Sequence, residues 1–213
     1  IITFGLHHTA DYCAQNISFD SNGDGVFDLV YQGKPTGDSI HLNVIGEHNI
    51  ANALSSIAIA QFYNIPMDAI QEGLNAFHGT ERRFEQKGSF NGVTVVDDYA
   101  HHPDEITATL NSAKNYPHNK IWCVFQPHTY SRTKALMPEF AKALSLADNI
   151  VLAKIYPARE TDNLGISSAD LMELIKAEGK DCYYYESFED IEKFLLNNCI
   201  NGDLLITMGA GDV

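Results

Sequence analysis

Residues 93–106 read Val93-Thr94-Val95-Val96-Asp97-Asp98-Tyr99-Ala100-His101-His102-Pro103-Asp104-Glu105-Ile106, an apolar run that breaks into carboxylates, imidazoles and a proline. The apolar residues 93–96 predict a buried strand, and Pro103 followed by two acidic residues predicts the first turn of a helix. Four ionisable side chains therefore stand at the carboxyl end of a strand. Open α/β sheets bind their ligands at that end, so we expect a functional site here.

Strand and helix patterns alternate strictly through the rest of the chain. We expect strands at 93–96, 121–125, 150–155, 182–185 and 204–208, separated by helices near 104–114, 134–146, 169–177 and 188–197. Ser167 and Asp170 have the spacing of a capping box, which supports the third of these helices. This alternation predicts an α/β fold with a mostly parallel sheet and right-handed crossovers.

A turn rich in Asn, Asp and Gly lies between residues 16–19 and 26–31, and this pattern predicts a β-hairpin. The same turn matches the opening of a calcium-binding loop over residues 20–28. However, Tyr31 stands where such a loop has its bidentate glutamate, and both flanks have strand patterns. We therefore favour the hairpin over a calcium site.

Other elements precede residue 80. Residues 41–45 predict a strand, and helical spacing of apolar residues predicts a buried helix from Asn49 to about Tyr63. A second helix is expected after Pro66, with one apolar face formed by Ile70, Leu74 and Phe77. Because the pattern changes after these helices, we place a domain boundary at about residue 80, which divides the chain into 1–80 and 81–213.

The composition excludes several classes of protein. A net charge of -14 argues against general binding to nucleic acid or to anionic membranes, because both need a cationic surface. No apolar run approaches the roughly 20 residues of a membrane helix. The cysteines are too far apart to suggest a zinc site or a disulfide framework, which fits a cytoplasmic protein; they are Cys13, Cys123, Cys182 and Cys199.

The ends of the chain suggest a piece of a longer protein. It begins with Ile1 rather than Met, and it stops at Val213 directly after the segment Gly209-Ala210-Gly211-Asp212. A strand-to-helix turn with this composition normally leads into a helix. We therefore expect further sequence beyond these residues.

Asn49 and Asn52 lie at a strand-to-helix turn, one helical turn apart. A side-chain amide both donates and accepts, so the pair has the groups needed to bind the edge of an adenine ring. The alternative is that Asn49 only caps the helix.

Arg83 also has two interpretations. It is either a ligand for phosphate or ribose oxygens or a member of a surface ion pair.

Asp97 and Asp98 have three possible roles: acceptors for ribose hydroxyls, metal ligands, or groups that stabilise a turn. Polar segments also follow three of the other predicted strands. Because the carboxyl ends of parallel strands share one edge of a sheet, we expect one crevice rather than four unrelated turns. The three other segments are 126–133, 156–160 and 209–212.

Taken together, these segments resemble the Mur ligase family. The resemblance is carried, in order along the chain, by Gly46-Glu47-His48-Asn49 with Asn52, by Arg82-Arg83-Phe84-Glu85, by Asp97–Pro103, by Gln126–Thr133, by Tyr156–Glu160 and by Gly209–Asp212. It implies that residues 1–80 are the latter part of a central α/β ATPase domain. Residues 81–213 would form the C-terminal Rossmann-like domain, a mostly parallel sheet with helices on both faces.

The resemblance also implies a reaction. Family members use ATP and Mg2+ to convert a carboxylate into an acyl phosphate, which an amine then attacks. The segments 128–133 and 156–160 favour the branch of the family that joins L-alanine to UDP-N-acetylmuramate for peptidoglycan synthesis. The alternatives are a related ligase that attaches a tripeptide to the same UDP-sugar, and a non-catalytic regulator that binds nucleotide.

Residue roles follow from the resemblance position by position. Asn49 and Asn52 would contact adenine, and Arg83 and Asp98 would hold ribose or phosphate, with the nucleotide between the two domains. Arg132 and His128 would orient the carboxylate of the alanine, with Tyr99 also at the substrate. His101 and His102 would lie near the acyl phosphate. Position 129, often arginine in this branch, is Thr129.

Several parts of the family's machinery do not occur in these residues. The chain has no Gly-x-x-Gly-Lys-Ser/Thr phosphate loop, and the main magnesium ligands and the UDP-binding domain are expected outside it. We therefore expect the 213 residues alone to be inactive as a ligase.

Overall fold

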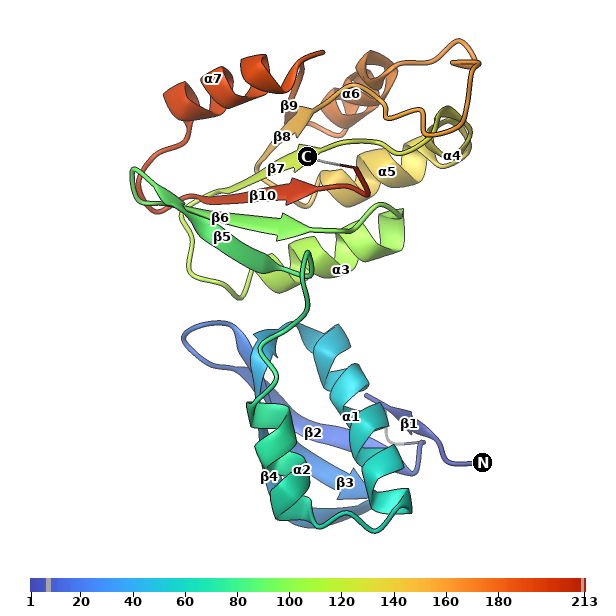
Figure 1. Ribbon diagram of the computed structural model, residues 1–213, viewed down its shortest axis with the longest axis vertical. Helices are drawn as coiled ribbons and strands as arrows, with labels where there is room; N and C mark the ends of the chain where they lie inside the picture. The colour runs from blue at the N-terminus through green and yellow to red at the C-terminus, as the bar shows by residue number, and fades with distance from the viewer. Residues whose placement is uncertain (7–8, 212) are drawn as a thin grey trace. The chain divides into compact units, whose positions relative to one another are not determined.

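The computed structural model describes residues 1–6, 9–211 and 213, which form two compact units (Figure 1). Unit 1 consists of Ile1–Gly79 and Ser112–Pro117, and unit 2 consists of Thr80–Asn111 and His118–Val213. Asp212, the last residue of the glycine-rich segment noted above, lies outside the described residues. Within the described residues, no helix has both the length and the apolar character that crossing a membrane requires.

Unit 1 contains a four-stranded sheet in the order β1-β2-β3-β4. β1 is parallel to β2, whereas β2, β3 and β4 pair antiparallel. The hairpin prediction is confirmed, because the turn joins β2 to β3 and Asp20 Oδ1 accepts hydrogen bonds from the backbone N–H groups of Asn22 and Asp24. The strands are β1 (Phe4–Gly5), β2 (Tyr12–Phe19), β3 (Asp24–Tyr31) and β4 (Lys34–Ile45).

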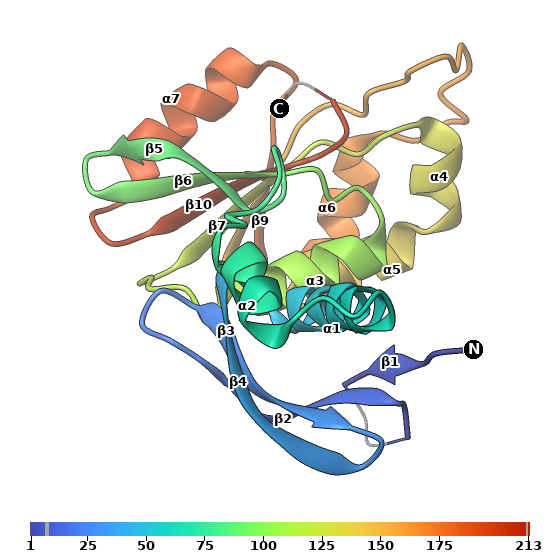
Figure 2. The ribbon, with the colours of Figure 1, turned by 60° about the horizontal axis from the view of Figure 1, so that its bottom comes forward.

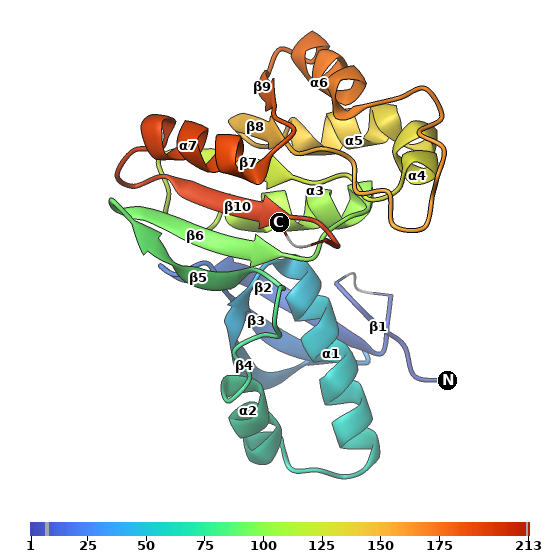
Figure 3. The ribbon, with the colours of Figure 1, turned by 45° about the horizontal axis from the view of Figure 1, so that its top comes forward.

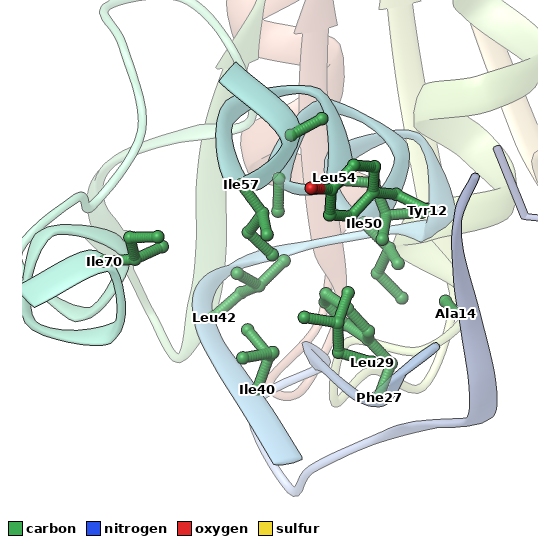
Figure 4. Close-up of a cluster of buried hydrophobic side chains, with 12 residues drawn as sticks. Tyr12, Ala14, Phe27, Leu29, Ile40, Leu42, Ile50, Leu54, Ile57 and Ile70 are labelled. Atoms are coloured by element: carbon green, nitrogen blue, oxygen red, sulfur yellow. The ribbon is translucent and has the colours of Figure 1, made fainter. Parts of the chain in front are cut away.

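Helices α1 (Glu47–Phe62) and α2 (Met67–Asn75) cover one side of this sheet, as Figure 2 shows. Alternate residues of β2, β3 and β4 meet the apolar face of α1, and Phe27 and Leu54 are fully buried in this core (Figure 4). Both helices were predicted. The prediction that Phe77 belongs to the apolar face of the second helix was wrong. α2 ends at Asn75, and Phe77 is 46% exposed.

Unit 2 is built on a six-stranded sheet in the order β5-β6-β10-β7-β8-β9. β6, β10, β7, β8 and β9 are parallel, and β5 joins the edge antiparallel to β6. The predicted mostly parallel sheet is confirmed, and the edge strand was not predicted. The strands are β5 (Glu85–Phe90), β6 (Val93–Asp98), β7 (Ile121–Phe125), β8 (Asn149–Leu152), β9 (Asp181–Tyr184) and β10 (Leu204–Met208).

Helices cover both faces of this sheet. α7 (Phe188–Asn198) packs through Ile191 and Leu195 on one face, and α3 (Pro103–Ala113) lies on the other (Figures 1 and 3). α6 (Ser168–Ala177) begins with the predicted capping box of Ser167 and Asp170. The single helix predicted over 134–146 is instead two helices, α4 (Tyr130–Ala135) and α5 (Met137–Leu144).

The division between α4 and α5 has a local cause. Leu136 adopts φ -118° and ψ 22°, outside the helical region, and Pro138 stands in the first turn of α5, where its missing N–H costs nothing. α4 starts four residues before the helix predicted near 134–146, so it includes Arg132, which that prediction left outside the helix.

Candidate functional site

The carboxyl ends of β6, β10, β7 and β8 are neighbours in unit 2. The pairs Met208 with Asp98, Met208 with Phe125, and Phe125 with Leu152 end in register, so the segments after these strands begin at one edge of the sheet. The predicted gathering of four polar segments at one edge is thus confirmed. We call residues 97–102, 126–132, 156–160 and 209–211 the strand-end cluster.

Aromatic rings from three of these segments form a row. The ring of Tyr99 lies 5.3 Å from that of His101, the ring of His101 lies 6.2 Å from that of His128, and His128 stacks on Tyr156 at 5.6 Å, all measured between centroids. Figure 3 shows the segments that follow β6 and β7. The segment after β6 contains Tyr99 and His101, and the segment after β7 contains His128. Three of the predicted site residues, Tyr99, His101 and His128, are therefore brought together.

The ring nitrogens of His101 have different roles. Nδ1 lies within hydrogen-bond distance, 3.0 Å, of the carbonyl oxygen of Tyr99, and it lies 3.4 Å from Oε2 of Glu105; neither oxygen can donate a proton. Nδ1 must therefore carry a proton, which leaves Nε2 of the neutral ring as an acceptor. The backbone N–H groups of His101 and His102 also donate to Glu105, whose carboxylate fixes this turn.

His102 differs from His101 in its surroundings. Its ring is exposed and lies at the start of α3, where Nδ1 accepts a hydrogen bond from the backbone N–H of Asp104 at 3.4 Å. Among the described residues, no ring contact joins His102 to the row of aromatic side chains. The two histidines predicted near the acyl phosphate thus have different surroundings.

Three side chains of the segment after β7 have a buried polar atom without a hydrogen-bond partner among the described residues. These atoms are Oε1 of Gln126, Nδ1 of His128 and Nη1 of Arg132. Burial, the positive charge of Arg132 and the nearby ring of His101 lower the pKa of His128 from its ordinary value. A buried, unpaired guanidinium N–H requires an acceptor, and a carboxylate or a phosphate provides one.

Asp98 is 4% exposed, and its oxygens already have protein partners. Oδ2 accepts from the backbone N–H of Phe84 at 2.9 Å, and Oδ1 accepts from that of Ala100 at 2.8 Å. Burial raises the pKa of Asp98, although these hydrogen bonds, that of Thr109 and the charge of Arg83 oppose the shift. Three roles were considered for Asp98: an acceptor for ribose hydroxyls, a metal ligand and a group that stabilises a turn. These contacts support the third.

Asp97 pairs with Arg82, a residue to which the sequence analysis assigned no role. Nε of Arg82 lies 2.9 Å from Oδ2 of Asp97, and Nη2 donates to the carbonyl oxygen of Gly209 at 2.8 Å. The guanidinium also lies 5.1 Å from the ring centre of Tyr99. Arg82 therefore connects the ends of β6 and β10. The sequence signal for it was only its position beside Arg83.

Arg83 has a different environment from Arg82. It is exposed, its guanidinium lies 5.9 Å from the ring centre of Tyr99, and among the described residues no carboxylate lies within ion-pair distance of it. The surface ion pair considered for Arg83 is therefore not formed within the described part of the chain. Its charge nevertheless acts on two carboxyls, because it is one of the influences that act to lower the pKa values of Asp98 and Glu105.

Asn49 and Asn52 belong to unit 1. The helix begins after Gly46, so Asn49 is not its N-cap, and that alternative was wrong. Nδ2 of Asn49 donates to the carbonyl oxygen of Ile45 at 2.9 Å, while Oδ1 accepts from Nδ2 of Asn52 at 3.2 Å. Asn52 is exposed, and its carbonyl oxygen Oδ1 has no protein partner among the described residues.

Glu160, which follows β8, was also missed. Its carboxylate accepts hydrogen bonds from the backbone N–H groups of Tyr130 and Ser131 and from the Ser131 hydroxyl. The hydroxyl is the strongest of the interactions that lower the pKa of Glu160. The sequence showed a carboxylate in the segment after a predicted strand, but it did not show which other segment this carboxylate contacts.

The donors for a metal ion are few. Among the described residues, no group of three or more His, Cys, Asp and Glu side chains is arranged to hold one. The carboxylates of Asp97, Asp98 and Glu160 are occupied by Arg82 or by N–H and O–H donors. These side chains do not fit a magnesium site on their own.

A mostly parallel α/β sheet with polar segments and a glycine-rich turn at its carboxyl edge is typical of α/β proteins that bind ligands at that edge. The family described as "Mur ligase, glutamate ligase domain" matches residues 82–211, more than half of the chain. The chain therefore belongs to the Mur ligase family.

Individual relatives agree with this assignment. A UDP-N-acetylmuramate–L-alanine ligase from Lachnospira eligens is 61% identical over 214 residues, which cover 100% of this chain and 46% of that protein. The crystal structure of the UDP-N-acetylmuramate-alanine ligase MurC from Thermotoga maritima has 30% identity and a TM-score of 0.84, and the match covers 99% of this chain and 45% of that one.

A murein peptide ligase from Psychrobacter arcticus has 26% identity and a TM-score of 0.60, with 96% of this chain and 42% of that one covered. The chain thus spans about half the length of the relatives it matches.

Proposed function

We propose that this chain is part of an ATP-dependent ligase that joins L-alanine to UDP-N-acetylmuramate in the cytoplasm, for peptidoglycan precursor synthesis. In this reaction the lactyl carboxylate of the UDP-sugar becomes an acyl phosphate. The amino group of L-alanine then attacks the acyl carbon, a C–N bond forms, and phosphate leaves. The proposal includes the domain assignment, with 1–80 in the central ATPase domain and 81–213 in the C-terminal domain.

The observation that carries the proposal is the buried Nη1 of the half-buried Arg132, near His128, which has no hydrogen-bond partner among the described residues. An α-carboxylate has the charge and the paired oxygens to accept hydrogen bonds from this guanidinium. The lowered pKa of His128 favours its neutral form, so His128 can donate one hydrogen bond without adding charge. Arg132 would therefore hold the carboxylate of L-alanine, and Tyr99 with His128 would position its other groups.

His101 and His102 are proposed to lie near the acyl phosphate. With Nδ1 bound to the Tyr99 carbonyl, Nε2 of His101 is an acceptor that can orient or receive a proton of the attacking amine. His102 is exposed, and its role would be to donate to phosphate oxygens. Catalysis of this type depends on positioning and on charge neutralisation more than on a protein nucleophile.

Of the side chains proposed to bind the nucleotide, Asn52 and Arg83 would contact it directly, whereas Asp98 would act through the backbone. The free Oδ1 of Asn52 would accept from the amino group of adenine, with Asn49 holding the Asn52 amide in place. The unpaired Arg83 would contact ribose or phosphate oxygens. Asp98 would act through the Phe84 backbone, which it fixes beside Arg83. ATP, when bound, supplies the phosphoryl group, and the ligands for Mg2+ would come mainly from sequence outside these residues.

The experiment uses a chimera in which this chain replaces the 214 matching residues of the Lachnospira eligens relative. We expect ADP and UDP-N-acetylmuramoyl-L-alanine to form only when ATP, the UDP-sugar and L-alanine are all present. The unmodified relative is the positive control, and the 213-residue chain alone should give no product. A chimera that binds nucleotide but never turns over would instead favour a non-catalytic regulator.

The same assay separates the alanine ligase from a ligase that uses a tripeptide. L-alanine, glycine, L-serine and the tripeptide are offered in parallel, and the proposal requires the highest kcat/KM with L-alanine. The greater similarity to the alanine ligase from Thermotoga maritima than to the murein peptide ligase supports this expectation. A preference for the tripeptide would overturn it.

A further inference from the structure

We propose that Glu160 is a positioning residue for Arg132, and that it sets the affinity for the carboxylate of the amino-acid acceptor. This inference rests on the proposed function and deepens it. Glu160 and Arg132 follow different strands, β8 and β7, and among the described residues they form no ion pair with each other. Glu160 acts instead on the backbone that carries Arg132.

Glu160 holds the first turn of α4. The backbone N–H of Tyr130 lies 2.5 Å from Oε2 of Glu160, and that of Ser131 lies 3.1 Å from the same oxygen. The Ser131 hydroxyl donates to Oε1. These three hydrogen bonds end one residue before Arg132, so the carboxylate of Glu160 holds the first two residues of the helix that carries Arg132.

The backbone beside these contacts is strained. Thr129 has φ 68° and ψ 141°, a conformation that β-branched residues rarely adopt. Such a conformation persists only where surrounding contacts fix it. Oγ1 of Thr129 accepts from the N–H of Arg132, and the carbonyl of Thr129 accepts from the hydroxyl of Thr133 at 2.7 Å. Glu160 fixes the next two residues.

Backbone pairing brings the segment with Glu160 to this position. Thr129 N–H donates to the carbonyl of Tyr156 at 2.8 Å, and Tyr156 N–H donates to that of Pro127 at 2.9 Å. The ring of Tyr156 stacks on that of His128. The segment after β8 therefore supports both side chains that are proposed to receive the acceptor.

Charge explains why a carboxylate suits this role. The hydrogen bonds from Ser131 and Tyr130 lower the pKa of Glu160, so it remains ionised and keeps accepting at neutral pH. Because these N–H groups and this hydroxyl satisfy Glu160, it does not need the guanidinium of Arg132. The positive charge of Arg132 thus remains available for the carboxylate of the acceptor.

The test measures steady-state kinetics of the chimera with Glu160→Ala and Glu160→Gln. We expect the KM for L-alanine to rise on the order of 10- to 100-fold with Glu160→Ala, since small displacements of positioning groups have effects of this size. Glu160→Gln keeps one acceptor oxygen and should have a smaller effect. The KM values for ATP and for the UDP-sugar should stay within about twofold, and the exposed Glu173→Ala on α6 serves as the matched control.

A double-mutant cycle distinguishes positioning from general stability. If Glu160 acts through Arg132, then Glu160→Ala should add little to the KM for L-alanine once Arg132→Ala is present. Equal effects on all three KM values, or full additivity with Arg132→Ala, would overturn the inference. Failure of the unmodified chimera to use L-alanine would overturn the proposed function instead. Amide exchange in the 213-residue chain then tests the geometry alone, with faster exchange of Tyr130 and Ser131 expected in Glu160→Ala.

Discussion

The imidazole rings of His101 and His128 lie 6.2 Å apart, one after β6 and the other after β7. β10 separates these two strands in the sheet, so the two segments reach past the end of β10 to meet. The contact affects proton binding, because the ring of His101 is one of the groups that lower the pKa of His128, after burial and Arg132. The charge of Arg132 and the neighbouring ring of His101 therefore act on the same imidazole, that of His128.

The first prediction concerns the dependence of stability on pH. A lowered pKa in the folded state means that unfolding takes up a proton at His128, so stability is lost as the pH falls from about 6.5 toward the lowered value. His128→Gln should weaken this loss, and the exposed His102→Gln should not. Urea unfolding of unit 2, followed by the fluorescence of Trp122, the single tryptophan, measures both variants. If the free energy of unfolding depends on pH equally in His128→Gln and in the unchanged chain, His128 is not the group responsible for this loss of stability.

The second prediction concerns Arg82. Arg82→Ala leaves the carboxylate of Asp97, whose side chain is 10% exposed, without its cation, and frees the carbonyl of Gly209. Losing one partner of a largely buried pair should lower the free energy of unfolding of unit 2 by about 3 kcal/mol. Lys193→Ala, which breaks an exposed pair with Asp190, should cost less than about 1 kcal/mol. The account fails here if the two variants have similar unfolding midpoints.

The third prediction concerns Asp98. Asp98→Asn places an amide N–H2 group where the carboxylate accepts from the backbone of Phe84 or of Ala100. A lost hydrogen bond and a buried donor without a partner should cost about 1–3 kcal/mol in unfolding of unit 2. Asp104→Asn, at a side chain that is 96% exposed, is the control. A fully stable Asp98→Asn chain would show that Asp98 has no structural role.

The fourth prediction concerns the nucleotide. Asn52→Ala removes the only amide oxygen of the pair that has no protein partner among the described residues, and the loss of one hydrogen bond should raise the KM for ATP about 10-fold in the chimera. The KM for L-alanine should not change. Ser56→Ala, one turn further along the exposed side of α1, is the control. An unchanged KM for ATP would remove Asn52 from the proposed adenine contacts.

Most of the sheet in unit 2 could be predicted because its central strands are continuous apolar runs. Residues 121–125 are all buried, which leaves the pattern little ambiguity. β5 could not be predicted in this way, because its sequence Glu85-Gln86-Lys87-Gly88-Ser89-Phe90 is mainly polar and exposed. A polar edge strand is stabilised by its neighbour β6, and its own pattern resembles a loop.

The site was predicted at the level of segments but not of individual contacts. Polar residues after buried strands correctly identified the edge of the sheet, because parallel strands place their carboxyl ends together. The sequence could not show that Arg82 binds Asp97 while its neighbour Arg83 stays unpaired. Nor could it show that Glu160 binds Ser131, because that contact depends on the register of two loops.

The central claim is that Arg132 receives the carboxylate of the acceptor, and the KM for L-alanine in the chimera with Arg132→Ala tests it most directly. Loss of a charge-assisted interaction should raise this KM on the order of 100-fold, while the KM for ATP stays within about twofold. Arg132→Lys should recover only part of the loss, because an ammonium lacks the planar pair of donors. Lys142→Ala, at an exposed position on α5, should change neither value. An unchanged KM for L-alanine, or an equal rise in both KM values, would contradict the account.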